Sequence, residues 1–376
     1  MKGNLPSVRF FGEPNFKSGY GNATRNFCYS FSESKINTSF FFSKKISKSF
    51  IKKLINYPKE CDIDFYIHTP PFSRHRSNKY KIGYFYWEAD SLPIEWQRDI
   101  LCLNEIWAPC KLVKKACLRA GFRGPIEILP TPFSRTQEGP TDTMFPSPIS
   151  DNFLLSDGIF KFYSIFQWHK RKGYSDLLKA YYEEFSADDN VVLIIKTHPL
   201  AGERGSVDKI KFDILSIKNR INKKRPAKVF LITDFLEKNQ IDDLHRGSDC
   251  FVLPHRGEGW GMPIHDALLA GNHVIATKYG GITEFLDEDS LHIIPHDIGP
   301  VREMPWTHLY SSSQSWAYPK YICLKEIMRD VYKNKSNNYY IDRCNNGKSI
   351  AESFSIESCS KNIEKILSKD RFKQMR

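Results

Sequence analysis

The segment at residues 255–284 reads HRGEGWGMPIHDALLAGNHVIATKYGGITE and contains the strongest structural signals in the chain. The apolar run at 250–253, directly before it, is typical of a buried strand. The glycine-rich stretch 257–261 predicts a loop, and Pro263 follows it where the first helical residue would stand, because proline loses no hydrogen bond there. The segment thus predicts a strand, a loop that leads onto a helix, and a second strand at 273–276.

This loop has the composition of an anion site. Free backbone N–H groups and the helix dipole attract phosphate at a helix N-terminus, and glycines let the backbone approach it closely. Glu258 precedes the helix and Asp266 lies eight residues further on, and carboxylates accept hydrogen bonds from sugar or ribose hydroxyls. Taken singly, Glu258 reads as a helix cap and Asp266 as a solvated helix residue, but their combination with the loop favours a binding site.

The same alternation of strands and helices extends along the chain. It continues on both sides of a stretch rich in Pro, Ser and Thr at 131–157, which we interpret as a linker. The alternation predicts an α/β fold with a parallel sheet in each of two domains, 1–150 and 151–354. A helix at about 355–376 is expected to pack back on the first domain. The strands are expected at 8–11, 65–68, 82–86, 105–108 and 126–129, then at 160–166, 191–196, 229–232, 250–254 and 273–276.

Length, cysteine content and charge narrow the class of protein. The chain has 376 residues, more than one hydrophobic core normally organises. Its nine Cys include no C-x-x-C pair, which argues against a disulfide scaffold or a zinc site. We find no signal peptide and no run of about 18 apolar residues, so we expect a cytoplasmic protein. The net charge of +12 is concentrated in residues 1–60, which favours an anionic partner.

The segment at 255–284 resembles the signature of retaining, family-4-like glycosyltransferases (glycosyl transferases group 1). That signature runs E-G-F-G-L-P-x-x-E-A, then a strand, then G-G-x-x-E. The matching residues here are Glu258, Gly259, Trp260, Gly261, Met262 and Pro263, followed by Gly280, Gly281 and Glu284. The resemblance implies the GT-B fold, in which two Rossmann-like domains face one another across a cleft. The first would bind the acceptor and the second the nucleotide-sugar donor.

The resemblance also implies roles for the two acids. Glu258 would approach the donor sugar, and the second acid would hold the ribose hydroxyls. Here the second acid is Asp266, where the family usually has Glu, so the shorter side chain changes the geometry of the ribose contact. The donor contacts implied in this way, together with the N-terminal glycine pair, are Gly19, Gly21, Gly259, Trp260, Gly261, Met262 and Asp266.

A second match lies at residues 169–173, which read HKRKG and follow the predicted strand 160–166. The family carries a basic pair or a lone Lys before Gly at this place. By resemblance Lys172 and Arg171 neutralise the donor diphosphate, which gains negative charge as it leaves. Gln167 stands near the position of a family Arg, so Arg171 would supply that charge. The predicted catalytic residues are therefore Lys172, Arg171 and Glu258, which should lie together.

The N-terminal half resembles the family more loosely. Gly19 and Gly21 occupy the place of a glycine-rich loop, which we expect at 18–22 with a helix after it. Residues 82–130 and the WAYP element at 316–319 are similar to those of a subgroup that carries the E-G-W-G loop. Three polar residues near predicted strand ends are candidates to orient the acceptor: Glu88, Asp90 and His68.

These observations together predict a hexosyltransferase that retains anomeric configuration. It would need no metal and no cofactor other than a UDP- or GDP-type nucleotide-sugar co-substrate. The acceptor would be a glycan or a lipid-linked glycan, most naturally in bacterial surface polysaccharide synthesis. The basic, apolar-interleaved stretch 44–55 would bind the anionic inner face of the plasma membrane, or form an ordinary half-buried helix. No nucleic-acid partner is expected.

Two alternatives stay open at this point. Asp62-Ile63-Asp64 has the spacing of the Asp-x-Asp motif of metal-dependent transferases, but it lies far from the segment at 255–284. The basic stretch at 44–55 also fits a nucleic-acid-binding module, which would show a steep salt dependence on generic DNA or RNA.

Overall fold

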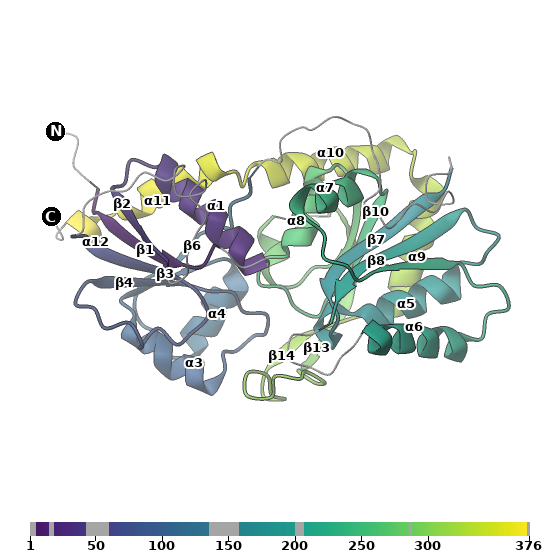
Figure 1. Ribbon diagram of the computed structural model, residues 1–376, viewed down its shortest axis with the longest axis horizontal. Helices are drawn as coiled ribbons and strands as arrows, with labels where there is room; N and C mark the ends of the chain where they lie inside the picture. The colour runs from purple at the N-terminus through teal and green to yellow at the C-terminus, as the bar shows by residue number, and fades with distance from the viewer. Residues whose placement is uncertain are drawn as a thin grey trace. The chain divides into compact units, whose positions relative to one another are not determined.

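The computed structural model describes residues 5–14, 19–42, 60–134, 158–199, 207–285 and 288–373. The chain divides into two compact units (Figure 1). Unit 1 comprises Met1–Arg135, His308–Tyr310 and Ser353–Arg376, and unit 2 comprises Thr136–Thr307 and Ser311–Glu352. The predicted domain boundary at 150/151 and the basic stretch 44–55 lie outside the described residues.

Unit 1 is built on a six-stranded parallel sheet in the order β2-β1-β3-β4-β5-β6. The central strand β3 is buried along its whole length, as its mainly apolar sequence IDFYI favours, and its one acid, Asp64, is paired with Arg9. The strands are β1 (Val8–Gly12), β2 (Thr38–Phe41), β3 (Ile63–Ile67), β4 (Tyr80–Tyr84), β5 (Glu105–Ala108) and β6 (Ile126–Ile128). The helical elements between them are α1 (Gly19–Glu33), α3 (Ile94–Asp99), η1 (Ile100–Cys102) and α4 (Lys111–Arg119).

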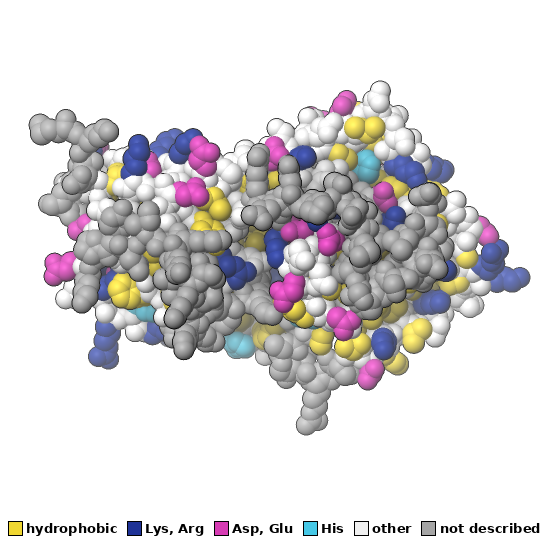
Figure 2. Space-filling model, turned by 45° about the horizontal axis from the view of Figure 1, so that its top comes forward, with side chains coloured by type: hydrophobic (Ala, Val, Ile, Leu, Met, Phe, Trp, Pro, Cys, Tyr) yellow, Lys and Arg dark blue, Asp and Glu magenta, His cyan; other side chains and the backbone are white. Residues whose placement is uncertain are grey.

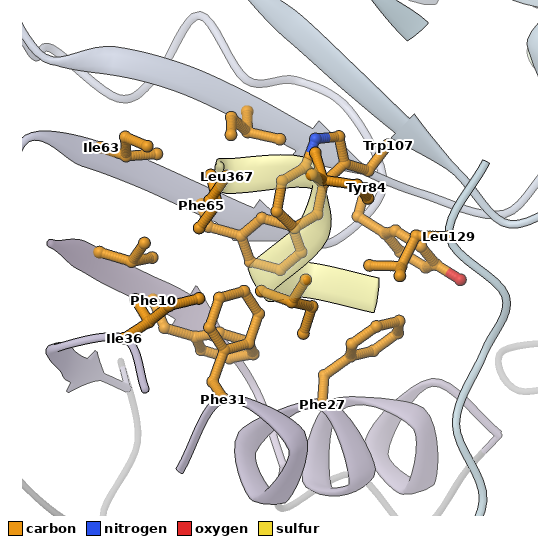
Figure 3. Close-up of a cluster of buried hydrophobic side chains, with 14 of the residues drawn as sticks. Phe10, Phe27, Phe31, Ile36, Ile63, Phe65, Tyr84, Trp107, Leu129 and Leu367 are labelled. Carbon is orange, nitrogen blue, oxygen red and sulfur yellow. The ribbon is translucent and has the colours of Figure 1, made fainter. Parts of the chain in front are cut away.

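Aromatic side chains fill the core of unit 1. Figure 3 shows Phe27 and Phe31 pointing from α1 toward the sheet, where Phe65 and Trp107 lie. Leu367 completes this cluster from α11 (Ile356–Leu367), which packs along α1, and α12 (Asp370–Lys373) follows it. The end of the chain is thus part of the N-terminal core.

Unit 2 contains a second six-stranded parallel sheet, in the order β12-β11-β10-β7-β8-β9. Helices α5, α6 and α9 cover one face and α7, α8 and α10 the other (Figure 1). The strands are β7 (Phe160–Gln167), β8 (Val191–His198), β9 (Lys228–Ile232), β10 (Cys250–Leu253), β11 (His273–Thr277) and β12 (His292–Ile294). The helical elements are η2 (Lys170–Lys172), α5 (Tyr174–Glu184), α6 (Val207–Ile221), α7 (Lys238–Arg246), α8 (Met262–Leu269), η3 (Gly280–Glu284), α9 (Tyr321–Asn334) and α10 (Asn338–Glu352).

The two parallel sheets with their helices confirm the predicted α/β class and a sheet in each half of the chain. The strands that were not predicted are β2 and β12, each at an edge of its sheet, and an antiparallel hairpin of β13 (His296–Pro300) and β14 (Ser315–Pro319). One prediction was wrong. The expected loop at 18–22 is helical from Gly19 onward, because glycine destabilises a helix mainly in its interior and is accepted at its start.

The described surface carries charges of both signs. Figure 2 shows acidic and basic side chains interspersed over the described part of the face in view. Within the described residues, no helix is both long and apolar enough to cross a membrane.

Candidate functional site

Three loop segments meet at one edge of the sheet in unit 2. The basic segment η2 follows β7, the glycine-rich stretch 254–261 follows β10, and η3 follows β11. These strands are neighbours in a parallel sheet, so their carboxyl ends lie side by side. Ligands of open α/β sheets bind at this edge.

Glycines join η3 to the loop after β10. Gly280 has a φ of +83°, and a Cβ on it would stand 2.3 Å from the backbone oxygen of Glu258. A Cβ on Gly281 would stand 2.3 Å from the oxygen of Gly259, and the Gly281 N–H donates to the Glu258 oxygen at 2.7 Å. Only glycine permits this approach, so the G-G spacing in the sequence fixes the backbone that carries Glu258.

A third glycine joins the basic segment to the same loop. Gly173 ends η2 with a φ of +69°, and a Cβ there would lie 1.9 Å from the backbone oxygen of Pro254. The N–H of Arg256 donates to the Arg171 oxygen at 2.7 Å. The basic side chains that precede Gly173 are thus held directly against the loop that carries Glu258.

Lys172, Arg171 and Glu258 form a buried ionic cluster. The Lys172 ammonium contacts Glu258 Oε1, and Arg171 Nη1 lies 3.4 Å from the same oxygen and 2.5 Å from the Gly257 carbonyl oxygen. The three side chains are only 8 to 11% exposed. Burial alone would raise the pKa of Glu258, but the charges of Lys172 and Arg171 lower it to about 2. Two cations around one carboxylate leave a net positive charge that suits an anion.

Buried polar atoms without partners gather at this same edge. Among the described residues no group hydrogen-bonds to Thr197 Oγ1 at the end of β8 or to Thr277 Oγ1 at the end of β11. The same holds for His169 Nδ1 and for both ring nitrogens of His255. Burial lowers the pKa of His255 to about 3, so its imidazole is neutral. Native proteins rarely bury unpaired polar atoms, so their concentration here indicates a place for a ligand or water.

The start of α8 adds backbone donors. Gly261 caps the helix with a φ of +90°, and no described residue accepts a hydrogen bond from the N–H of Gly259, Gly261 or Met262. The Trp260 side chain is 3% exposed and packs on Phe285 with ring centroids 4.8 Å apart. Trp260 therefore anchors the loop through its ring.

Asp266 lies on α8, one turn beyond these amides. Its carboxylate accepts no hydrogen bond from any described residue. Burial raises the pKa of Asp266 to about 6, and the charge of Lys238 opposes this rise. An acid without a protein donor is suited to accept hydrogen bonds from ligand hydroxyls.

The residues predicted in unit 1 fall into two sets. Gly19 and Gly21 lie in the first turn of α1, where the hydroxyl oxygen of Tyr20, the residue between them, accepts a hydrogen bond from the Tyr86 N–H at 3.0 Å. Glu88 lies two residues after Tyr86 and accepts a hydrogen bond from the Tyr310 hydroxyl at 2.8 Å. These glycines and Glu88 thus belong to one tyrosine-rich region of unit 1.

The other two acceptor candidates lie in separate contacts. Asp90 pairs with Arg119 at 2.7 Å on the surface of unit 1. His68 Nε2 lies 2.9 Å from His75 Nε2, just beyond the carboxyl end of β3. The sequence did not indicate Tyr310, which belongs to no local motif, or a role for Arg256, which lies within residues 255–284.

Both acids of the Asp-x-Asp candidate make contacts within unit 1. Asp64 is fully buried and pairs with Arg9 through two hydrogen bonds of 2.7 and 2.8 Å. Asp62 accepts from the Ser7 N–H at 2.8 Å and from the Ser7 hydroxyl at 2.7 Å. Both acids therefore join strands of unit 1, and the described residues contain no group of three metal-ligating side chains.

Comparison with known proteins places the ionic cluster inside a recognised family segment. Residues 152–299 match the family described as glycosyl transferases group 1. A search of curated protein sequences gave no match.

Solved structures share the fold of the whole chain. One is described as trehalose-6-phosphate from E. coli bound with UDP-2-fluoro glucose (TM-score 0.68, 11% identity, 96% of this chain and 99% of that chain covered). Another is HepE from Anabaena in complex with UDP and glucose (TM-score 0.64, 14% identity, the same coverage). A third is the N-terminal domain of trehalose-6-phosphate phosphatase from Candida albicans (TM-score 0.63, 12% identity, 98% and 97% covered). The fold is therefore GT-B-like, as predicted, and the cleft between the domains stays a prediction.

Proposed function

We propose that this chain, a glycosyltransferase with a group 1 domain at residues 152–299, takes its sugar from a nucleotide diphosphate donor and transfers it to a glycan or lipid-linked acceptor. The observation that carries the proposal is the buried cluster of Lys172, Arg171 and Glu258 at the carboxyl edge of the sheet. The loop that carries Glu258 also presents the backbone N–H groups of Gly259, Gly261 and Met262 at the start of α8, and such groups together with cations suit a pyrophosphate.

The chain's own groups account for departure of the diphosphate. Lys172 and Arg171 stabilise the charge that develops on it as the glycosidic bond breaks. Glu258 holds both cations in place before the donor binds and accepts a hydrogen bond from a sugar hydroxyl afterwards. Asp266 accepts from the ribose hydroxyls. Because these two cations supply the positive charge, we propose that transfer needs no metal ion. The resemblance of residues 255–284 to retaining transferases supports the further proposal that the anomeric configuration is retained.

The donor class can be tested by thermal stabilisation. We expect UDP-sugars to raise the melting temperature more than GDP- or ADP-sugars, because the solved structures of similar fold contain UDP or a UDP-sugar. A ligand at 100 times its dissociation constant stabilises a protein by about 2.7 kcal/mol. Equal and negligible shifts with all three donors would contradict the proposal.

Metal independence and retention need separate measurements. UDP release from the donor should be unchanged in excess chelator. NMR should show that the sugar freed by slow donor hydrolysis first appears with the anomeric configuration of the donor. Loss of UDP release in chelator, restored by Mg²⁺ or Mn²⁺, would refute the metal-independent mechanism.

The cellular role is the broadest part of the proposal. We place the enzyme at the cytoplasmic face of a bacterial membrane, where it would extend a surface polysaccharide on a lipid-linked acceptor. Co-sedimentation with vesicles should then rise with their content of anionic lipid. Binding that ignores lipid charge would argue against this location.

A further inference from the structure

The hairpin β13–β14, the chain that follows β13 and Arg256 line an open pocket of unit 2 that the donor cluster does not use. The Ala317 N–H donates to the Arg256 oxygen at 2.8 Å, which joins the hairpin to the loop after β10. The pocket has a volume of about 620 Å³, within the ~300–1,000 Å³ typical of small-molecule sites. Its charged and aromatic lining consists of Arg256, Asp297, Arg302, Glu303 and Tyr318.

Arg256 is held rigidly in the wall of this pocket. Its side chain is 10% exposed, and its guanidinium carbon lies 4.8 Å from the centre of the Tyr318 ring and 5.7 Å from that of Trp316. The Tyr318 hydroxyl donates to the Pro300 oxygen at 2.6 Å. Gly299 leaves room for the Tyr318 ring, since a Cβ there would come within 3.0 Å of it. The aromatic rings of β14 thus pack against the Arg256 guanidinium and hold it in the pocket wall.

The donors of Arg256 are poorly satisfied. No described group accepts from its buried Nε. The nearest carboxylate oxygens are those of Asp176 at 3.7 Å and Glu303 at 4.0 Å, both beyond hydrogen-bond distance. A buried guanidinium with unused donors is costly unless a ligand or water accepts from it. The residue that approaches it, Glu303, has a φ of +60°, a strained conformation that often marks a functional loop.

The lining distinguishes between ligand classes. Arg256 and Arg302 present only donors, whereas Asp297 and Glu303 present acceptors, and the four charges cancel. An anion would meet two carboxylates, and a cation would meet two guanidinium groups. A hydroxyl both donates and accepts, so several hydroxyls on one ring can satisfy both kinds of group at once.

We infer that the pocket beside Arg256 binds an uncharged sugar residue of the acceptor through its hydroxyl groups. The inference rests on the proposed function, because it takes the acceptor to carry a sugar residue. The pocket is joined to the donor cluster at two points. The backbone N–H of Arg256 donates to the backbone oxygen of Arg171, and Lys170 Nζ lies 3.9 Å from Glu303 Oε1. A sugar held here is therefore anchored to the same loops that hold the diphosphate.

The test is saturation-transfer NMR on the full chain without donor, with neutral mono- and disaccharides of glucose, galactose, mannose and N-acetylglucosamine. At least one should bind to the wild type, and Arg302→Ala and Glu303→Gln should each weaken its affinity about tenfold. Both positions are exposed, so both variants should fold. The control Arg220→Ala, an exposed change on α6, should bind as the wild type does.

Several outcomes would overturn the inference. They are the absence of binding by every neutral sugar at millimolar concentration, equal affinity in wild type and both variants, and tighter binding of glucuronate than of glucose. Thermal stabilisation by UDP-sugars, measured on the same variants, should be unchanged. If UDP-sugars do not stabilise the wild type, the proposed donor is refuted instead. The sugar-binding measurement is made without donor, so its result can still be interpreted.

Discussion

Glu105 in unit 1 and Glu258 in unit 2 are both buried carboxylates held by basic side chains, yet their surroundings differ. Glu105 is fully buried and accepts two hydrogen bonds from Arg371, at 2.6 and 2.8 Å. Trp107 Nε1 donates to it at 2.7 Å and the Tyr80 hydroxyl at 3.1 Å. Its oxygens are thus surrounded by donors from the protein itself, and the pair fastens α12 to the sheet.

Glu258 lies in a cluster that the protein leaves incomplete. Its neighbour His255 has no hydrogen-bond partner among the described residues on either ring nitrogen, and neither does Arg256 Nε. The two acids also lie at opposite ends of their strands. Glu105 begins β5, whereas Glu258 follows the carboxyl end of β10. A buried ion pair alone therefore does not indicate a functional site. Buried polar atoms without partners around the ion pair are the feature that indicates one.

The largest expected effect tests the incomplete cluster. Lys172→Ala should lower UDP release from a UDP-sugar by about 100- to 1,000-fold, because it removes one of two groups that stabilise the leaving diphosphate. The melting temperature should change little, since Arg171 still faces Glu258. Lys211→Ala, an exposed change on α6, is the matched control and should release UDP at the wild-type rate. Near-normal turnover of Lys172→Ala would show that the Glu258 cluster, like the Glu105 cluster, serves the fold and not the transfer.

The complementary change tests the complete cluster. Arg371→Ala leaves Glu105 buried without its cation and should lower the free energy of unfolding by about 3 kcal/mol. Chemical denaturation measures this loss, and the affinity for a UDP-sugar should stay unchanged. Adding Glu105→Gln should recover part of the stability, because it removes the unpaired charge. A weaker affinity for the donor without loss of stability would show that the two clusters do not differ in kind.

A glycine substitution tests how the backbone holds Glu258. Gly280→Ala combines a φ of +83° with a Cβ only 2.3 Å from the Glu258 oxygen. Gly271→Ala is a matched control, because Gly271 has a φ of +79° but nothing within 4 Å of its Cβ position. The control should lose about 1 kcal/mol of stability, and Gly280→Ala about 2 kcal/mol together with affinity for the donor. Equal effects of both changes would mean that the close contact is unimportant.

The segments proposed to bind the donor were the part of the molecule that the sequence predicted best. Its signals are local, because strand, glycine loop and helix follow one another within residues 250–284. The spacing of Gly280 and Gly281 also has a direct physical meaning, since each lets one backbone lie against another. The prediction that Lys172 and Glu258 lie together, 86 residues apart, came from the resemblance alone.

The remaining features depend on contacts that no local pattern encodes. Arg371 reaches Glu105 across 266 residues, and Tyr310 reaches Glu88 across 222. The hairpin β13–β14 was missed because its strands are separated by a long irregular stretch, 301–314, which lacks a hairpin turn signal. Gly19 was placed in a loop because two glycines lie close together there and resemble a glycine-rich loop of the family, but glycine is accepted at the start of a helix.

The smallest expected effect concerns Asp266, the second acid of the site, and is read from pH dependence. Burial raises its pKa from an ordinary 3.8 to about 6, so the folded protein holds this proton more tightly than the unfolded chain does. Ionisation of Asp266 therefore lowers stability as pH rises from about 4 through 6. Asp266→Asn should be more stable than the wild type by about 1–2 kcal/mol at pH 8, and equally stable below pH 4.

Affinity for the donor should change in the opposite sense. Only the ionised carboxylate accepts from both ribose hydroxyls, so the wild type should bind a UDP-sugar more weakly as pH falls through 6, while Asp266→Asn should show no such step. A UDP-sugar is the right ligand for this titration, because a terminal phosphate such as that of UDP itself titrates near pH 6. If Asp266→Asn keeps the wild-type pH step, another group is responsible, and Asp266 belongs with Glu105 among acids that serve the fold.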